Sequence, residues 1–98
     1  MSATTSIPRH VEKEHIASLR FPVVEVISDH SKQTKRMRDL ELATTLGNVD
    51  HGKITIVFED DEGLKMVTTT IWATTDTRII LKGGVVIPIS RIHEVRFL

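Results

Sequence analysis

The chain has 98 residues and contains no cysteine. This absence excludes disulfide frameworks, zinc sites built from thiolates, and cysteine nucleophiles. Tyrosine is also absent, and the aromatic residues are one tryptophan and three phenylalanines. Side chains on which nucleic-acid bases could stack are therefore scarce.

An excess of positive charge is missing as well. The 13 lysines and arginines are balanced by 13 acidic residues, so the formal net charge is zero. Sequence-independent binding to a phosphate backbone requires a surplus of lysine and arginine. Any nucleic-acid function of this chain would therefore have to rest on a local basic patch.

Long apolar runs are lacking too. No stretch approaches the roughly 20 apolar residues of a membrane-spanning helix, and the first ten residues have no apolar signal-peptide core. The hydrophobic content of 40% and the charged content of 27% are typical of globular proteins. We expect one cytoplasmic domain with no membrane partner.

Motifs that carry catalysis are not found. No serine lies in a Gly-x-Ser-x-Gly elbow, and the glycine pair Gly83-Gly84 precedes a strand pattern instead of the helix that a phosphate loop requires. The five histidines lack metal-ligand spacing. The acidic run Glu59–Gly63 lacks the spacing of a calcium loop and indicates a solvated hairpin tip. We expect no enzyme activity, no cofactor and no metal site.

Residues 1–30 form a predicted N-terminal extension. Residues 1–8 are small and polar, and we expect them to be frayed. Residues 9–20 favour a short amphipathic helix that ends before Pro22. Residues 23–28 indicate a possible strand, with Val24 and Val26 on one face. The pattern leaves open whether this extension packs on the main domain, pairs with a second chain or is partly mobile.

Residues 31–98 form the predicted main domain, which begins with a helix over residues 32–46. Ser31 can cap its start, and Gly47-Asn48 is a typical helix stop. Met37, Leu40, Ala43 and Leu46 recur at helical spacing and predict one buried stripe.

The second half of the chain predicts five strands, at residues 53–59, 64–75, 78–82, 85–89 and 92–97. The strand at 64–75 is long for a small sheet, which indicates a bend or bulge. Gly83-Gly84 fits a two-residue hairpin, with positive φ expected at Gly84. Pro88 marks a strand edge or break, because proline has no backbone N–H.

The fold class is therefore mainly β, within the α+β class. We expect the helix to be followed by a five-stranded antiparallel meander that closes into a small barrel, because closure removes exposed edges. The helix would cover one open end. The core would contain Met37, Leu40, Ile54, Ile56, Phe58, Ile79, Leu81, Ile87, Ile89, Val95 and Phe97.

This arrangement resembles a known group of folds. The order of elements is similar to that of SH3-like barrels, the Sm-like kind in particular. It consists of a helix, a meander, a short turn and a closing strand, and the meander contains Leu81-Lys82-Gly83-Gly84 and Ile87-Pro88-Ile89. The likeness covers about residues 32–98 and concerns topology, so it implies little about function. RNA-binding Sm-like proteins carry an Asp-x-Met-Asn type signature that is missing here, and only Lys82-Gly83 fits their second motif. In length the chain also resembles short bacterial proteins, which implies no mechanism.

A basic run on the predicted helix is the first candidate site. Lys32, Lys35 and Arg36 share a helix face, with Arg38 to one side. Such a face can contact phosphates or an acidic partner. The alternative is an ordinary solvated helix surface.

The second candidate is the threonine-rich strand around Trp72. Thr68, Thr70 and Thr74 lie on the same predicted face as this tryptophan. An exposed tryptophan would mark an interface, whereas burial in the core is the commoner outcome for this residue.

The leading hypothesis is a non-enzymatic small-barrel binding or assembly module that forms a homo-oligomer. Its interface would involve Trp72, Val24 and Val26, or a sheet edge. The alternative is RNA or other nucleic-acid binding through Lys32, Lys35, Arg36 and Arg38. Binding of a small ligand or metal in the barrel mouth is a third option, with little in the sequence to favour it.

Overall fold

The computed structural model describes residues 7–98. The prediction of a frayed start falls mainly on residues 1–6 and lies outside the described residues. The described chain has one long helix, one short helix and two sheets. The helices are α1 (Lys13–Ile16) and α2 (His30–Asp50), with a 3₁₀ turn, η1 (Ile89–Arg91). The strands are β1 (Arg9–His10), β2 (Ile54–Glu59), β3 (Leu64–Thr69), β4 (Ile71–Thr74), β5 (Arg78–Leu81), β6 (Val86–Pro88) and β7 (Ile92–Phe97).

The long helix α2 extends beyond its predicted limits at both ends. Its N-cap is Asp29, whose Oδ1 accepts a hydrogen bond from the Ser31 N–H at 2.9 Å, so the prediction of a Ser31 cap is wrong. Gly47 does not stop the helix. His51 takes the left-handed conformation instead, with φ 54°, and its N–H binds the Gly47 carbonyl. Gly47 has a different role, because a Cβ there would collide with the Ile71 carbonyl of β4.

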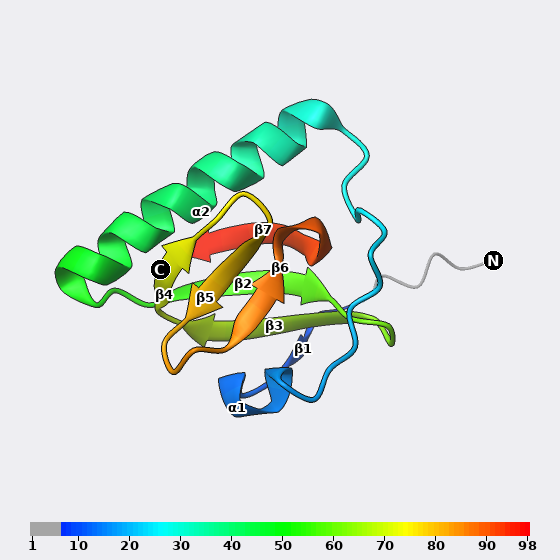
Figure 1. Ribbon diagram of the computed structural model, residues 1–98, viewed down its shortest axis with the longest axis horizontal. Coiled ribbons are helices and arrows are strands. Elements are labelled where there is room, and N and C mark those ends of the chain that lie inside the picture. The colour runs from blue at the N-terminus through cyan, green and yellow to red at the C-terminus, as the bar shows by residue number, and fades with distance from the viewer. Residues whose placement is uncertain (1–6) are drawn as a thin grey trace.

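The sheets divide the strands into two groups (Figure 1). β1, β3, β2 and β7 form a four-stranded sheet in that order, and β4, β5 and β6 form a three-stranded sheet. The predicted long strand bends at Thr70, so β3 belongs to one sheet and β4 to the other. This confirms the predicted bend and the strand-rich α+β class.

The prediction of five strands that close into a barrel is not confirmed. Seven strands are present in residues 7–98, because the long strand is divided and β1 is added. No ladder among them joins β6 to β7. β6 is three residues long and ends at Pro88, which has no N–H to donate, and the chain then turns through η1.

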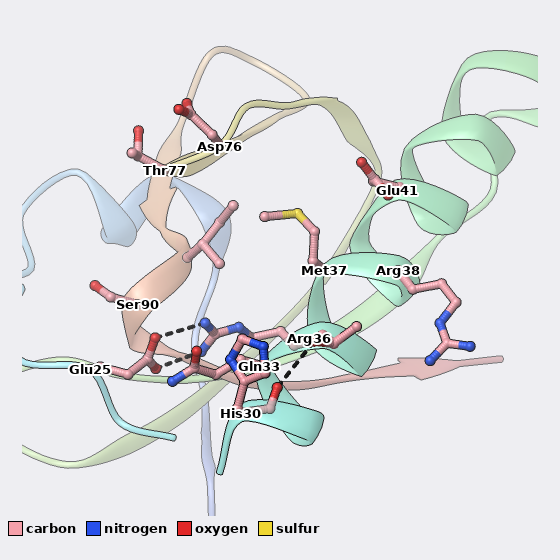
Figure 2. A pocket seen from close by; sticks show the side chains of 12 residues that line it. Glu25, His30, Gln33, Arg36, Met37, Arg38, Glu41, Asp76, Thr77 and Ser90 are labelled. Carbon is pink, nitrogen blue, oxygen red and sulfur yellow. Dashed lines mark hydrogen bonds and ion pairs between the residues drawn. The ribbon is translucent and has the colours of Figure 1, made fainter. Parts of the chain in front are cut away.

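The N-terminal extension packs on the main domain through Ile16 and other apolar side chains and also through polar contacts, of which Figure 2 shows the pair of Glu25 and Arg36. The predicted helix at 9–20 reduces to β1 and the single turn of α1, and the predicted strand at 23–28 is wrong. The segment is irregular because its backbone groups bind other elements. Arg91 Nη1 donates to the Val24 carbonyl at 2.6 Å, the Val26 N–H to the Ser90 carbonyl at 2.9 Å, and Arg36 binds the Glu25 carboxylate.

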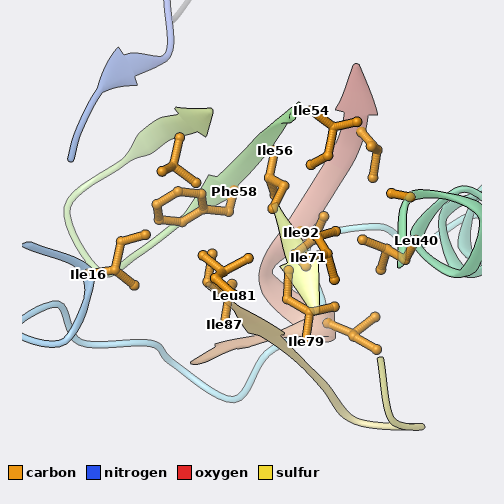
Figure 3. Close-up of a cluster of buried hydrophobic side chains, with 14 residues drawn as sticks. Ile16, Leu40, Ile54, Ile56, Phe58, Ile71, Ile79, Leu81, Ile87 and Ile92 are labelled. Atoms are coloured by element: carbon orange, nitrogen blue, oxygen red, sulfur yellow. The ribbon is translucent and has the colours of Figure 1, made fainter. Parts of the chain in front are cut away.

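The core lies between the two sheets and is closed by the helices (Figure 3). Nine of the eleven predicted core residues are buried, whereas Met37 is only partly buried and Phe97 is 41% exposed. Phe97 is the last residue of β7, which is an edge strand of the four-stranded sheet. Ile16 of α1 joins the core as an addition that the sequence did not predict. Gly83 and Gly84 have φ of 90° and 84°, which confirms the turn at this place and the positive φ expected at Gly84. The prediction of a two-residue loop is wrong, because Ile80 opposes Val86 and the Leu81 N–H binds the Val85 carbonyl, which leaves three residues, 82–84, in the loop.

Within residues 7–98, neither α1 nor α2 is both long enough and apolar enough to cross a membrane.

Candidate docking face

The predicted basic face of α2 does not present four free cations. Arg36 is buried, with 7% of its surface exposed. Its Nη1 and Nη2 donate to the two oxygens of Glu25 at 2.7 and 2.8 Å, and Nη1 also donates to the Ile92 carbonyl at 3.0 Å. The hydrogen bonds from Arg36 are the main reason that the pKa of the Glu25 carboxyl lies below its ordinary value. Arg36 is therefore a structural cation, and the prediction that it shares a solvent face is wrong.

The remaining cations of the run are divided between two grooves beside α2. Lys35 is exposed and pairs with Asp39 at 2.6 Å. One groove of about 720 Å³, seen in Figure 2, contains Arg38 with the acidic residues Glu41 and Asp76. The other, of about 490 Å³, contains Lys32 and Lys35 with the acidic residues Asp29, Asp39 and Glu94. Neither groove has the surplus of positive charge that a phosphate backbone requires.

Val24 and Val26, the other predicted interface residues, are poorly placed for strand pairing. The Val24 side chain is 68% exposed, but its carbonyl accepts from Arg91. Val26 is partly buried and its N–H is bound to Ser90. Because these backbone groups are already paired within the chain, the segment cannot add a second chain as a regular strand.

The residues of the predicted threonine face do not lie on one surface either. Thr70 is buried at the bend, and Thr74 bonds to Thr44 of α2 at 2.6 Å. Thr68 is exposed and bonds to Thr55 across the four-stranded sheet at 2.8 Å. These contacts stabilise three different parts of the fold and do not make one binding surface.

Trp72 is 48% exposed, contrary to the commoner expectation of burial. Its position follows from the register of β4 against β5. Ile71 opposes Leu81 and Ala73 opposes Ile80, so Trp72 is the extra residue of a β-bulge. The bulge directs the large side chain away from the filled interior.

The outer face of the three-stranded sheet is apolar at its centre. Ile79, Leu81 and Ile87 are fully buried, so alternation places Ile80 and Val86 on the opposite face. Ala73, Ile80 and Val86 stand in one row across the three strands. Val86 is 39% exposed. We call the surface formed by Trp72, Ala73, Arg78, Ile80, Lys82 and Val86 the outer face.

Neither helix of residues 7–98 covers this surface. α2 packs against β4 and β7, and α1 against β3. In Figure 1 the strands β5 and β6 lie in front of the four-stranded sheet, with α2 along one side and α1 along the other. The outer face is therefore open to a partner.

Two exposed cations flank the apolar centre. Arg78 begins β5 two residues before Ile80, and Lys82 lies two residues after Ile80, in the turn that follows β5. The Lys82 N–H still binds the Thr70 carbonyl at 3.0 Å, so the alternation along β5 extends to this residue and places all three side chains on the outer face. Among residues 7–98 neither cation forms an ion pair. Neither residue is among the sites predicted from the sequence, and the signal that could have identified them is their period-two spacing around Ile80.

The sheet edges offer less to a partner than this face. α2 packs beside the outer strands β4 and β7. β1 has two residues, and β6 has three and contains Pro88. Short edges and edge prolines hinder the addition of a further strand. The geometry therefore favours docking on a face over docking on an edge.

The described residues give little support to catalysis. No group of three or more histidine or acidic side chains in residues 7–98 could hold a metal ion. His93 Nε2 lies 2.8 Å from Glu59 Oε1, and Arg91 Nη2 lies 3.7 Å from Glu59 Oε2. This cluster joins β2 to β7, and within residues 7–98 no hydroxyl group hydrogen-bonds to its side chains.

Comparison of the chain with known protein families, characterised proteins and solved structures finds no match.

Proposed function

We propose that this protein is a non-enzymatic binding module that docks another protein on the outer face. The observation that supports the proposal most strongly is the exposure of Trp72 on a helix-free sheet surface. Tryptophan is enriched at protein interfaces and often dominates their binding energy. Beside Trp72 lies an uncovered apolar row formed by Ala73, Ile80 and Val86. An exposed apolar patch of this kind marks an interaction site.

The fold is compatible with this role. The order of elements supports the proposed likeness to SH3-like barrels: α2 is followed by the meander from β2 to β6, then by η1 and β7. The likeness is to an open form of such a barrel, because β6 and β7 are not paired. Such folds host many functions, so the likeness adds no residue-level role.

Selection of peptides on the immobilised protein tests the proposal. A random peptide library displayed on phage would be selected on the wild-type chain and counter-screened against Trp72→Ser. We expect peptides that bind the wild type and lose most of their affinity for Trp72→Ser, while circular dichroism shows that the variant is folded. Peptides that bind both proteins equally would contradict docking on the outer face.

Self-association is one form that such docking can take. A homodimer would place the same surface on both sides of a two-fold interface. Light scattering after size-exclusion chromatography, over a range of concentrations, tests this form. A dimer that dissociates in Trp72→Asp supports it. A monomer at every concentration would exclude self-association and leave docking of a different protein as the proposed function.

Nucleic-acid binding is the second candidate function. It is favoured by Lys32 and Arg38, which are exposed and form no ion pair within residues 7–98. Burial of Arg36 weakens it. A shift of labelled RNA at low salt that is lost in Lys32→Glu/Arg38→Glu would support this function, and the absence of any shift would end it.

A further inference from the structure

We infer that the outer face binds an acidic, amphipathic segment of another protein in preference to a second copy of this chain. The inference rests on the proposed docking function and adds the chemistry of the partner. It depends on the order of charged and apolar groups along β5.

The outer row of β5, continued by the first residue after the strand, reads cation, apolar, cation. Arg78 and Ile80 occupy the outward positions of β5, and Lys82 in the following turn continues the row because its N–H still binds the Thr70 carbonyl. No carboxylate pairs with either cation within residues 7–98. Asp76 is the nearest acidic residue in sequence and lies in the turn before β5, outside the strand. The face is therefore positive at both ends of an apolar centre.

A second copy would fit this pattern poorly. In a two-fold arrangement of outer face on outer face, with β5 antiparallel to its symmetry mate, Arg78 of one copy would approach Lys82 of the other. Opposed like charges at a desolvating interface are unfavourable and select against that pairing. An acidic partner neutralises both cations and still covers the apolar row.

The spacing of the cations specifies the partner further. Lys82 follows Arg78 by four residues, which corresponds to about 13 Å at the usual rise of extended chain. An extended segment matches this with acid-x-apolar-x-acid, so that an apolar side chain meets Ile80 while the two acids meet the cations. Further apolar residues of the segment would contact Trp72 and Val86, the most exposed apolar side chains of the face.

Trp72 supplies a direct signal for the test. It is the only tryptophan, and the chain has no tyrosine, so intrinsic emission excited at long wavelength comes from this side chain alone. Half-exposed indole that becomes covered by a peptide should shift its emission to shorter wavelength. Probe peptides that contain no aromatic residue leave the signal unambiguous.

The experiment titrates the full chain with two synthetic peptides of about 12 residues, a length suited to an extended docked segment. One contains Glu-x-Leu-x-Glu and the other Lys-x-Leu-x-Lys in the same frame. We expect a blue shift with the acidic peptide at low salt, weakening as salt is added. We expect the basic peptide to bind at least about tenfold more weakly.

Charge reversal gives the matched control. Arg78→Glu/Lys82→Glu should reverse the preference, so that the basic peptide binds better than the acidic one. Lys32→Glu/Arg38→Glu makes the same change in net charge on α2 and should leave the preference intact. Circular dichroism verifies that both variants are folded. Equal effects of the two double variants would overturn the inference, because net charge and not the outer face would then decide binding.

The remaining outcomes separate this inference from the proposed function. A Trp72-dependent response to the basic peptide alone would contradict an acidic partner while leaving docking on the outer face intact. Binding of a thymidine oligonucleotide that is lost in Arg78→Glu/Lys82→Glu, with no response to the acidic peptide, would overturn the inference in favour of nucleic acid. No response to either peptide, together with failure of the phage selection, would contradict both.

Discussion

Arg36 and Glu25 face each other across eleven residues of sequence and join by two parallel hydrogen bonds of 2.7 and 2.8 Å. The arginine side chain is 6% exposed and the glutamate side chain 32%. A bidentate pair of this kind is stronger than a single-point ion pair. It fixes the irregular extension against α2 and explains why a cation of the predicted binding face is unavailable to a ligand.

Removal of Arg36 should destabilise the fold strongly. Arg36→Ala leaves the Glu25 carboxylate partly buried without its partner, and breaking buried pairs costs about 3 kcal/mol or more. Lys35→Ala removes an exposed pair with Asp39 and should change the free energy of unfolding by no more than about 0.5 kcal/mol. Urea denaturation measures both. Equal effects of the two variants would mean that Arg36 is not buried as described.

The same pair gives a stability contribution that depends on pH. Because hydrogen bonds from Arg36 lower the pKa of Glu25 in the folded state, the contribution is fully present above the unfolded pKa, about 4.3. It is lost as the pH falls through the lower, folded value. The gap in unfolding free energy between wild type and Glu25→Gln should therefore narrow below about pH 4.3. A gap that stays constant from neutral pH to pH 3 would contradict this linkage.

Gly47 should behave unlike an ordinary helix glycine. In a solvent-exposed helix, Gly→Ala stabilises by up to about 1 kcal/mol. Here the added Cβ would meet the Ile71 carbonyl and lie 2.8 Å from the Thr70 methyl group, so Gly47→Ala should destabilise by more than about 1 kcal/mol. The exposed neighbour Asn48→Ala is the control and should be neutral or slightly stabilising. Thermal unfolding that shows a gain for Gly47→Ala would exclude the close approach of α2 to β4.

A buried ion pair in the β2–β3 hairpin makes a further test. Lys65 Nζ lies 2.7 Å from Asp60 Oδ1, and the two side chains are 7% and 1% exposed. Burial raises the pKa of Asp60, but hydrogen bonds from Lys65 and two backbone N–H groups outweigh it and lower the pKa overall. Lys65→Met should therefore cost about 3 kcal/mol by leaving a buried carboxylate unpaired.

Glu62 provides the comparison for that pair. Its carboxylate lies 3.8 Å from Lys65 Nζ but is 76% exposed. Glu62→Gln should change the unfolding free energy by less than about 0.5 kcal/mol. Adding Asp60→Asn to Lys65→Met should recover part of the loss, because the unpaired charge is removed. If the changes in unfolding free energy caused by the two substitutions simply add in the double variant, the two side chains are not directly coupled.

The strands of the second half were predictable because their apolar residues alternate and their turns contain specific residues. The predicted strand at 53–59 and the observed β2 differ by one residue, and the turn at Gly83-Gly84 was located correctly, although its loop has three residues instead of the two predicted. Barrel closure was not predictable, since nothing local indicates that Ile89–Arg91 form a 3₁₀ turn in place of a ladder.

The first half was harder to predict because tertiary contacts determine it. Arg36 looks like a surface cation in its helix, and its partner Glu25 lies in a segment without periodicity. Gly47 looks like a helix stop, although its real constraint is contact with a strand far along the chain. Pairwise contacts of this kind leave no periodic signal in the sequence.

The candidate site was predicted only in part. Trp72 was identified, but its exposure depends on a bulge that the sequence does not locate. Arg78 and Lys82 were missed because Ile79-Ile80-Leu81 is apolar throughout, so the run does not show which face is inward.

Quenching of Trp72 fluorescence tests the central claim most directly, because it probes the outer face without any partner. The claim is that this single tryptophan is exposed and lies on a surface flanked by Arg78 and Lys82. At low ionic strength, iodide should quench more strongly than caesium, since cations attract the anionic quencher. Arg78→Glu/Lys82→Glu should reverse that order. Equal and strong protection from both ions would show a covered tryptophan and contradict the account.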